Sequence, residues 1–196
     1  LQDVERFYGR PAAVIADMSS AIAAAVENVW GEQVSIFICQ FHFLRDIGKD
    51  LLGDTHVKLQ KSFATCQLTA RLNSLRKSFV TNSTKYKKNE EDYLQGMTII
   101  DWVLDYKSEL NAEGYPFDLP WENYFQRCDA AHDHIEKILQ DKERVYNQKQ
   151  TNILGKIQDQ LSRITTPKAH RRRYNALKEE AETFAEIRVL FQQDTT

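Results

Sequence analysis

Residues 14–31, VIADMSSAIAAAVENVWG, predict a strand, a turn and a helix in immediate succession. Residues 12–16 form a short apolar run of the kind found in buried strands. Ser19 or Ser20 is a suitable N-cap for the alanine-rich helix that follows, and Gly31 is a suitable terminator. An acidic residue, Asp17, stands between the strand and the helix, and the function of this region depends on its role.

The same order recurs directly downstream. Residues 34–38, VSIFI, predict a second strand, and CQFHFLRDIGKDLL at 39–52 contains a second helix, from about 42 to 52, that Gly53 is expected to end. Two strands that alternate with two helices through short links form a βαβα unit, so the strands are expected to be parallel. Parallel strands end at the same sheet edge, where Asp17 and Cys39 are expected to meet.

The rest of the chain is predicted to be helical. Apolar residues recur at helical spacing over 56–111, and NAEGYPFDLPW at 111–121, with one Gly and two Pro, predicts a loop. Further helices are expected at 121–148, 151–165 and 168–192. The expected chain is therefore predominantly helical, with a boundary between domains at residues 1–53 and 54–196.

The composition limits the possible functions. Lys and Arg number 26 and Asp and Glu 28, which gives a net charge of −2, so any contact with nucleic acid must come from a local patch. Three cysteines suit a reduced intracellular protein better than a disulfide scaffold. No apolar run reaches the ~18 residues of a membrane span, so no membrane association is expected.

The strongest local basic patch is PKAHRRRYNALK at 167–178. Its basic residues are Lys168, Arg171, Arg172, Arg173 and Lys178. A smaller cluster, KYKK, occupies 85–88. Such side chains bind DNA phosphates without reading the base sequence, whereas the alternative for both runs is an ordinary solvated surface.

Residue chemistry alone leaves two roles open for Asp17. An acid at the junction of a strand and a helix stabilises the helix N-terminus, which would make Asp17 a capping residue. If Ser19 or Ser20 caps the helix instead, the Asp17 carboxylate is available for other chemistry.

Cys39 and His42 form a C-x-x-H pair at the start of the second predicted helix. Zinc requires four ligands, so this pair is at most half of a zinc site. The candidates for the other half are Cys66, and Cys128 with His132 or His134. The alternative is a buried thiol and an imidazole that opens the helix.

The two halves together resemble a known family. The pattern P-A-A-V-I-A-D-M-S-S-A-I-x-x-A-V-x-x-V-W, followed by C-x-x-H-x-x-R-x-I-x-K-x-L, is similar to the centre of DDE transposases of the Mutator-like type and their bacterial insertion-sequence relatives. The resemblance covers residues 10–52 well and the remainder in general layout only. It implies an α/β fold: a partial RNase H-like core (βαβα) at 1–53, followed by a mostly α-helical insertion subdomain at 54–196.

The resemblance also implies roles for single residues. Asp17 becomes the second acid of a catalytic triad and a metal ligand, and Cys39 and His42 become the family motif near the active site. Arg45 and Lys49 match basic helix positions of that motif and are expected to contact DNA. The basic residues at 168 and 171–173 are expected to contact DNA as well.

The implied chemistry is metal-dependent DNA cleavage and strand transfer in DNA transposition. Such enzymes use carboxylates to hold two divalent cations, here Mg²⁺ or Mn²⁺. The first acid is expected upstream of Leu1, and the late acids are expected to be solvated rather than catalytic. These late acids are Glu179, Glu180, Glu182 and Glu186. We therefore expect the isolated chain to be inactive and to hold no metal tightly.

The expected partners are transposon-end DNA and further copies of the chain, because open strand edges favour self-association. The expected location is intracellular, in a bacterial cytoplasm or a nucleus. One alternative is a non-catalytic DNA-binding or assembly module derived from a transposase. Another is an unrelated helical protein whose first residues match the pattern by chance.

Overall fold

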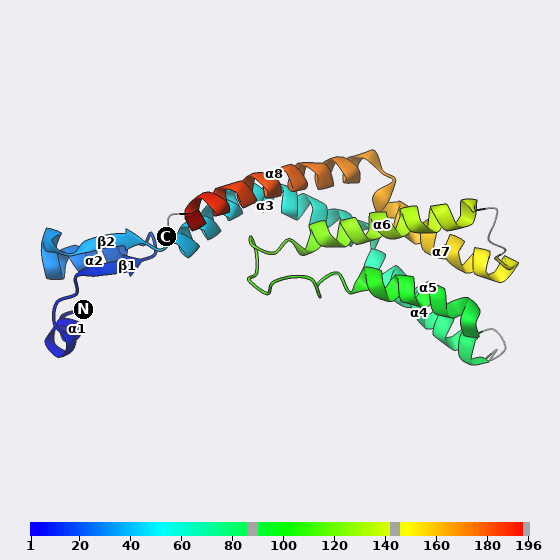
Figure 1. The fold of residues 1–196 in the computed structure, drawn as a ribbon, viewed down its shortest axis with the longest axis horizontal. Coiled ribbons are helices and arrows are strands. Elements are labelled where there is room, and N and C mark those ends of the chain that lie inside the picture. The colour runs from blue at the N-terminus through cyan, green and yellow to red at the C-terminus, as the bar shows by residue number, and fades with distance from the viewer. Residues whose placement is uncertain (86–89, 142–145, 194–196) are drawn as a thin grey trace. The chain divides into compact units, whose positions relative to one another are not determined.

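The computed structural model describes residues 1–85, 90–141 and 146–193 (Figure 1). The chain divides into two compact units: unit 1 comprises Leu1–Leu51 with Thr183–Thr196, and unit 2 comprises Leu52–Glu182. The functional division into a catalytic core at 1–53 and an insertion subdomain at 54–196 stays a prediction.

Unit 1 is built around two short parallel strands. Its elements are α1 (Gln2–Tyr8), β1 (Ala13–Ala16), α2 (Ser20–Trp30), a 3₁₀ turn η1 (Gly31–Gln33), β2 (Ser35–Ile38), the first part of α3 (Gln40–Cys66) and the last part of α8 (Lys168–Gln193). The strands pair in register from Ala13 opposite Ser35 to Ala16 opposite Ile38. The predicted parallel pairing is therefore confirmed.

The expected RNase H-like core is wrong. The only sheet among the described residues contains β1 and β2, and every long element after β2 in the described ranges is a helix. The reason lies in the sequence after residue 53, where apolar residues recur at the period of a helix and supply no further strands. The expectation of a predominantly helical chain is confirmed.

One side of unit 1 holds a small apolar core. Its buried residues are Val26, Trp30 and Val34, with Val14 and Val29 packed against them. Arg10 closes this side, because its Nη2 donates a hydrogen bond of 2.7 Å to the Trp30 carbonyl at the end of α2, and its Nη1 donates to Gln33.

Several apolar side chains of the sheet remain outside this core, and Ile15 and Phe37 are the two most exposed of them. Ile15 and Phe37 are opposite each other in the strand register and are 74% and 58% exposed. A two-stranded sheet with this much uncovered apolar surface is marginal on its own. This exposed pair is therefore a candidate contact surface.

The helix that follows β2 is longer than predicted. α3 passes through Gly53 and ends at Cys66, so the expectation that Gly53 ends the helix is wrong. Gly53 has no positive φ, and a Cβ there would lie 3.6 Å from Tyr115 Oη, in ordinary contact. The chain turns instead at Gln67, whose φ is 51°.

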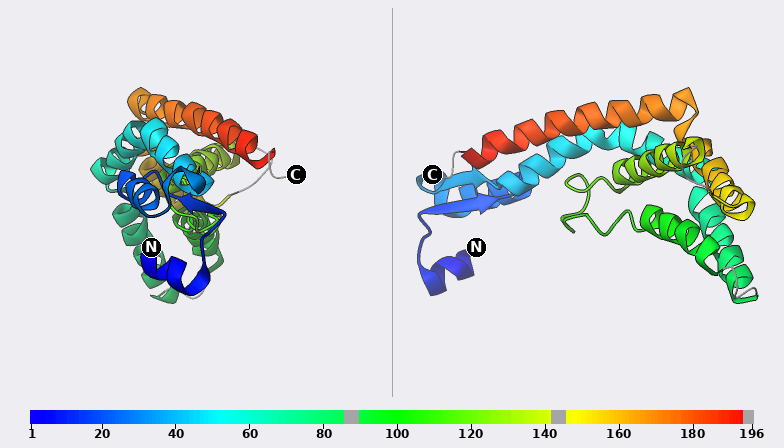
Figure 2. Two further views of the ribbon diagram at one scale, coloured as in Figure 1. Left: turned by 90° about the vertical axis from the view of Figure 1, so that its left-hand side faces the viewer. Right: turned by 45° about the vertical axis from the view of Figure 1, so that its right-hand side comes forward.

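The regular elements of unit 2 in its described ranges are all helices. It contains the remainder of α3 together with α4 (Leu68–Lys85), α5 (Glu90–Leu104), α6 (Pro120–Gln140), α7 (Gln148–Thr165) and most of α8. α4 lies beside α5, and α6 beside α7 (Figures 1 and 2). The fully buried apolar side chains include Leu59, Leu72, Ile100, Phe125, Ile135, Leu154, Ile157, Leu161 and Ile164.

The segment between α5 and α6 is a structured loop, as predicted for 111–121. The buried Asp118 carboxylate accepts hydrogen bonds from the backbone N–H groups of Asn111 (2.9 Å) and Gly114 (2.7 Å). The start of α6 is anchored by stacked rings, because Tyr124 lies 4.4 Å from Phe63 and 4.2 Å from Tyr106 between ring centroids. Such packing fixes both the loop and α6 on the helical core.

Candidate functional site

The carboxyl edge of the two-stranded sheet brings two predicted site residues together. Asp17 directly follows β1 and Cys39 directly follows β2. The Cys39 backbone N–H donates a hydrogen bond of 2.7 Å to the carbonyl oxygen of Ala16, the residue before Asp17. The expectation that these two positions share one edge is therefore confirmed.

The Asp17 carboxylate takes part in the start of α2. Its Oδ1 accepts a hydrogen bond of 3.0 Å from the backbone N–H of Ser19, the N-cap residue, whose own side chain makes no capping hydrogen bond. Asp17 is exposed, and its second oxygen has no hydrogen bond within the described chain. One oxygen therefore has a structural role, and the other is available to a ligand.

Asp17 alone does not fit a site for Mg²⁺ or Mn²⁺. Two-metal chemistry requires several carboxylates around a shared phosphate. In the described parts of the chain, one group of three potential ligands has its ligand atoms within 4.8 Å of one another, and Asp17 is not a member. That group is His132, Asp133 and Glu136 on α6. We therefore derive no metal-dependent step from this chain.

The zinc alternative for Cys39 and His42 gains no support. No three-ligand group within 1–85, 90–141 and 146–193 contains a cysteine. Cys128 is completely buried, and burial raises the pKa of its thiol well above the usual value, which disfavours the thiolate that zinc binds. Cys39 and His42 are half-buried, and His42 Nδ1 is buried with no hydrogen-bond partner among the described residues.

The two basic residues predicted on α3 share an acidic neighbour. Asp46 Oδ1 lies 3.8 Å from Arg45 Nε and 3.7 Å from Lys49 Nζ. All three side chains are more than a third exposed, so these ion pairs are weak and leave both cations accessible.

The structure divides the basic run at the start of α8 into two kinds of residue. Arg171 donates from Nη1 and Nη2 to the Asp129 carboxylate, each at 2.6 Å, and its guanidinium lies 5.4 Å from the Phe125 ring centroid. Arg173 Nη1 donates to the hydroxyl of the buried Ser62 at 2.7 Å. These two arginines tie α8 to α6 and α3 and are engaged in holding the fold.

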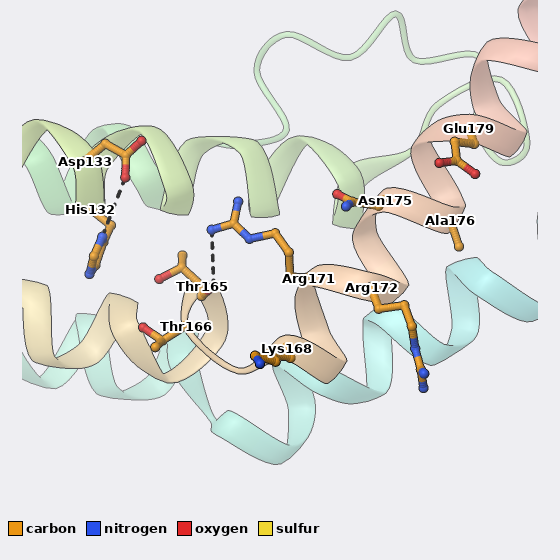
Figure 3. Close-up of a pocket in the computed structure, with 10 residues that line it drawn as sticks. All are labelled: His132, Asp133, Thr165, Thr166, Lys168, Arg171, Arg172, Asn175, Ala176 and Glu179. Atoms are coloured by element: carbon orange, nitrogen blue, oxygen red, sulfur yellow. Dashed lines mark hydrogen bonds and ion pairs between the residues drawn. The ribbon is translucent and has the colours of Figure 1, made fainter.

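Lys168 and Arg172 are different. Both are exposed, and neither has a hydrogen bond or an ion pair in the described parts of the chain. They line a hollow of about 690 Å³ beside α6, the turn between α7 and α8, and α8. The complete lining is His132, Asp133, Thr165, Thr166, Lys168, Arg171, Arg172, Asn175, Ala176 and Glu179 (Figure 3). In that view, Arg171 is directed toward α6 and Arg172 away from it.

The remaining candidates are the four late acids on α8 and the smaller basic cluster at 85–88. Glu180 is half-buried and accepts a hydrogen bond from the Thr55 hydroxyl, so the expectation that it is merely solvated is wrong. The other three late acids are exposed, as predicted. Residues 86–88 of the smaller basic cluster lie outside the described residues.

Sequence reasoning missed the part of the hollow that comes from other helices. His132 and Asp133 lie on α6, and Thr166 lies in the turn before α8. The spacing of His132 and Glu136, four residues apart on a predicted helix, is a signal that they share a face. No local signal indicates that this face lies beside Lys168.

No family model, curated protein or solved structure matches the chain. No helix within the described ranges combines the length and the apolar composition needed to cross a membrane.

Proposed function

We propose that the chain is part of a DNA transposase and contributes one acidic residue, Asp17, to metal-dependent DNA cleavage and strand transfer. One observation supports this most directly: an exposed carboxylate ends β1 beside the Cys39–His42 motif that follows the parallel strand β2. The order of strand, acid, helix, strand and C-x-x-H is that of the DDE transposases that the sequence resembles.

In this proposal the chain supplies only one of the metal-binding carboxylates, Asp17. Hard divalent cations such as Mg²⁺ or Mn²⁺ need additional carboxylates, which other segments of the complete enzyme would have to supply. The isolated chain is expected to be inactive. Transposon-end DNA is the proposed partner, and action on DNA gives a proposed location in a bacterial cytoplasm or a nucleus.

The decisive variant is Asp17→Asn in the full-length protein, assayed for cleavage of transposon-end DNA with Mg²⁺ and with Mn²⁺. Asparagine keeps an oxygen that accepts the Ser19 N–H bond, so α2 still starts correctly, but it removes the negative charge that a metal requires. The expected result is loss of detectable cleavage with unchanged folding. The control is Asp50→Asn, which also removes one exposed carboxylate from unit 1 and should retain cleavage. Cleavage by Asp17→Asn at the wild-type rate would refute the catalytic role.

A second candidate function is a non-catalytic DNA-binding or assembly module. It is favoured by the hydrogen bond between Asp17 and Ser19, which gives one carboxylate oxygen a structural use, and by Lys168 and Arg172, which have no acidic partner among the described residues. This alternative predicts no cleavage by the wild-type full-length protein but measurable DNA binding.

We also propose that unit 1 self-associates through its exposed apolar surface. Ile15 and Phe37 are aligned across the strands and lack cover among the described residues. Burying these two side chains against a second copy would remove their apolar surface from water. Each Å² of buried apolar surface stabilises the association by ~25 cal/mol. Open strand edges add hydrogen-bonding groups to the same contact.

A further inference from the structure

The geometry points to a phosphate-binding subsite on the α8 side of the hollow, away from α6, where Lys168 and Arg172 hold the sugar-phosphate backbone of DNA. This inference rests on the proposed function for the identity of the nucleic acid. It goes further by stating which residues of the basic run touch DNA and which only position α8.

The basic residues at the start of α8 differ in whether their charges are already balanced. Arg171 has its charge balanced by the Asp129 carboxylate, and Arg173 is held by the Ser62 hydroxyl. Lys168 and Arg172 have no such partner within the described chain, although each carries a full positive charge. A cation without an acidic partner can neutralise a phosphate without first breaking an ion pair.

Spacing supports the same assignment. Lys168 and Arg172 are four residues apart on α8, so they share one face and are separated by ~6 Å along the helix axis. Successive phosphates on one DNA strand advance by ~3.4 Å along the duplex. Two long, flexible side chains at that separation can reach neighbouring phosphates of one strand.

The acids of the hollow do not cancel these two charges. Asp133 lies 3.8 Å from His132 Nδ1 on α6, and its charge also acts on Arg171. Glu179 is seven residues beyond Arg172, or ~10 Å along α8. The positive end of the hollow is therefore the turn between α7 and α8, where the exposed Thr166 hydroxyl adds a further donor.

The two engaged arginines make this end of the hollow rigid. Arg171 joins α8 to α6 and also donates to the Thr165 carbonyl at 3.2 Å, and Arg173 joins α8 to α3. The backbone that carries Lys168 and Arg172 is thus held on two sides. Removing the exposed pair should therefore leave the fold unchanged, which makes the site testable by substitution.

The experiment measures binding of the complete 196-residue chain to a fluorescent 30-base-pair DNA duplex by anisotropy, over a series of salt concentrations. The test variant is Lys168→Gln/Arg172→Gln. The matched control is Lys61→Gln/Lys156→Gln, which removes the same charge from two exposed lysines that do not line the hollow. The test variant should bind about ten-fold more weakly at low salt, and its log–log salt slope should fall by about 2, since each phosphate contact contributes about 0.9. The control should retain the wild-type slope.

Each other result overturns the inference in a recognisable way. Equal losses of DNA affinity in the test and control variants would mean that only net charge matters. DNA binding by the test variant equal to that of the wild type would exclude the hollow as a DNA contact. That result would leave the Asp17 proposal untouched, because the cleavage assay tests it separately. A wild-type chain that binds no DNA at all would refute both the subsite and DNA as the partner of this chain. Tighter binding to an RNA duplex of the same length, lost in the test variant, would reassign the subsite from DNA to RNA.

Discussion

Arg171 and Asp129 form a two-pronged ion pair between α8 and α6, with both N–O distances at 2.6 Å, although 42 residues separate them in sequence. The next residue, Arg172, forms no such contact within the described chain. Two adjacent arginines therefore have different roles: Arg171 stabilises the packing of α8 on α6, and Arg172 remains exposed at the surface. The contrast can be measured directly.

Arg171→Met should lower the free energy of unfolding by about 1–2 kcal/mol, because it removes a bidentate pair and the contact of the guanidinium with the Phe125 ring. Arg172→Met should change the free energy of unfolding by less than about 0.5 kcal/mol, as expected for an exposed residue with no ion pair within the described ranges. Urea denaturation followed by circular dichroism measures both values. Equal effects of the two substitutions would contradict the division of the basic run.

Two glycines of unit 2 should respond to alanine in opposite directions. A Cβ at Gly96 in α5 would lie 2.6 Å from Ile153 Cγ2 in α7, so Gly96→Ala should destabilise the unit by about 1–3 kcal/mol through overpacking. A Cβ at Gly155 meets nothing within 4 Å, so Gly155→Ala in the middle of α7 should stabilise it by about 0.5–1 kcal/mol. Thermal unfolding of both variants tests the close approach of α5 and α7. If the helices are this close at Gly96, the two substitutions must change the melting temperature in opposite directions.

Stability should fall on mild acidification, in part because of His56. Burial lowers the pKa of His56 below its usual 6.5, so the unfolded chain binds this proton more readily than the folded chain. The resulting loss begins as the pH falls through about 6.5 and is complete once the pH is below the folded-state pKa. His56→Phe keeps a ring against Tyr115, 4.6 Å away between centroids in the wild type, but removes the titration.

The measurement for His56 is the midpoint of urea denaturation at pH 7.5 and at pH 5. The difference between the two should be smaller in His56→Phe than in the wild type. It should not vanish, because burial also lowers the pKa of His170. An identical difference in both proteins would show that His56 is not protected from protonation in the fold.

The three thiols should differ sharply in reactivity. Cys128 is completely buried, and burial raises its pKa well above the usual value. Cys39 and Cys66 are partly exposed, although burial also raises the pKa of Cys66. A maleimide should therefore modify Cys39 and Cys66 in the folded chain, and Cys128 at least about 10³-fold more slowly, since that thiol reacts only after opening. Peptide mass spectrometry over time measures each site. Rapid labelling of Cys128 without denaturant would contradict the packing of α6.

The uncovered pair on the sheet should control self-association. Ile15→Thr/Phe37→Thr should weaken association of the chain in sedimentation-velocity experiments, because it removes apolar surface at the proposed contact and keeps the strand propensity of threonine. Val189→Thr/Leu190→Thr is the control, since it exchanges two exposed apolar residues near the end of α8. Association that is equally weakened by both variants would place the contact elsewhere.

The parallel pair of strands was predictable because local signals determine it. β-branched runs at 13–16 and 35–38 are each bounded by turn or capping residues, and the intervening helix is too long for a hairpin. The number of strands was not predictable in the same way. The RNase H-like core was inferred from a family resemblance that covers only residues 10–52. The residues after Gly53 have only helical periodicity and, in the ranges that the structure describes, supply no further strands to such a core.

The length of α3 and the roles of the basic residues depend on distant contacts. A glycine in a helix costs only about 1 kcal/mol relative to alanine, and the complete burial of Leu52 and Leu59 on either side of Gly53 outweighs it. The neutralisation of Arg171 by Asp129 has no local signal either, because the partner lies on another helix. Sequence alone therefore located the basic run but could not say which of its residues are free to bind.

Unit 1 is discontinuous, since it takes residues 1–51 from one end of the chain and 183–196 from the other, and both α3 and α8 cross the boundary without a break. A protease that cuts once inside the 105–119 loop would leave each fragment with one share of unit 1. A gene shortened to either half would likewise encode an incomplete module. Recombination that shuffles domains would have to insert or remove the whole of Leu52–Glu182 as one cassette between the two shares.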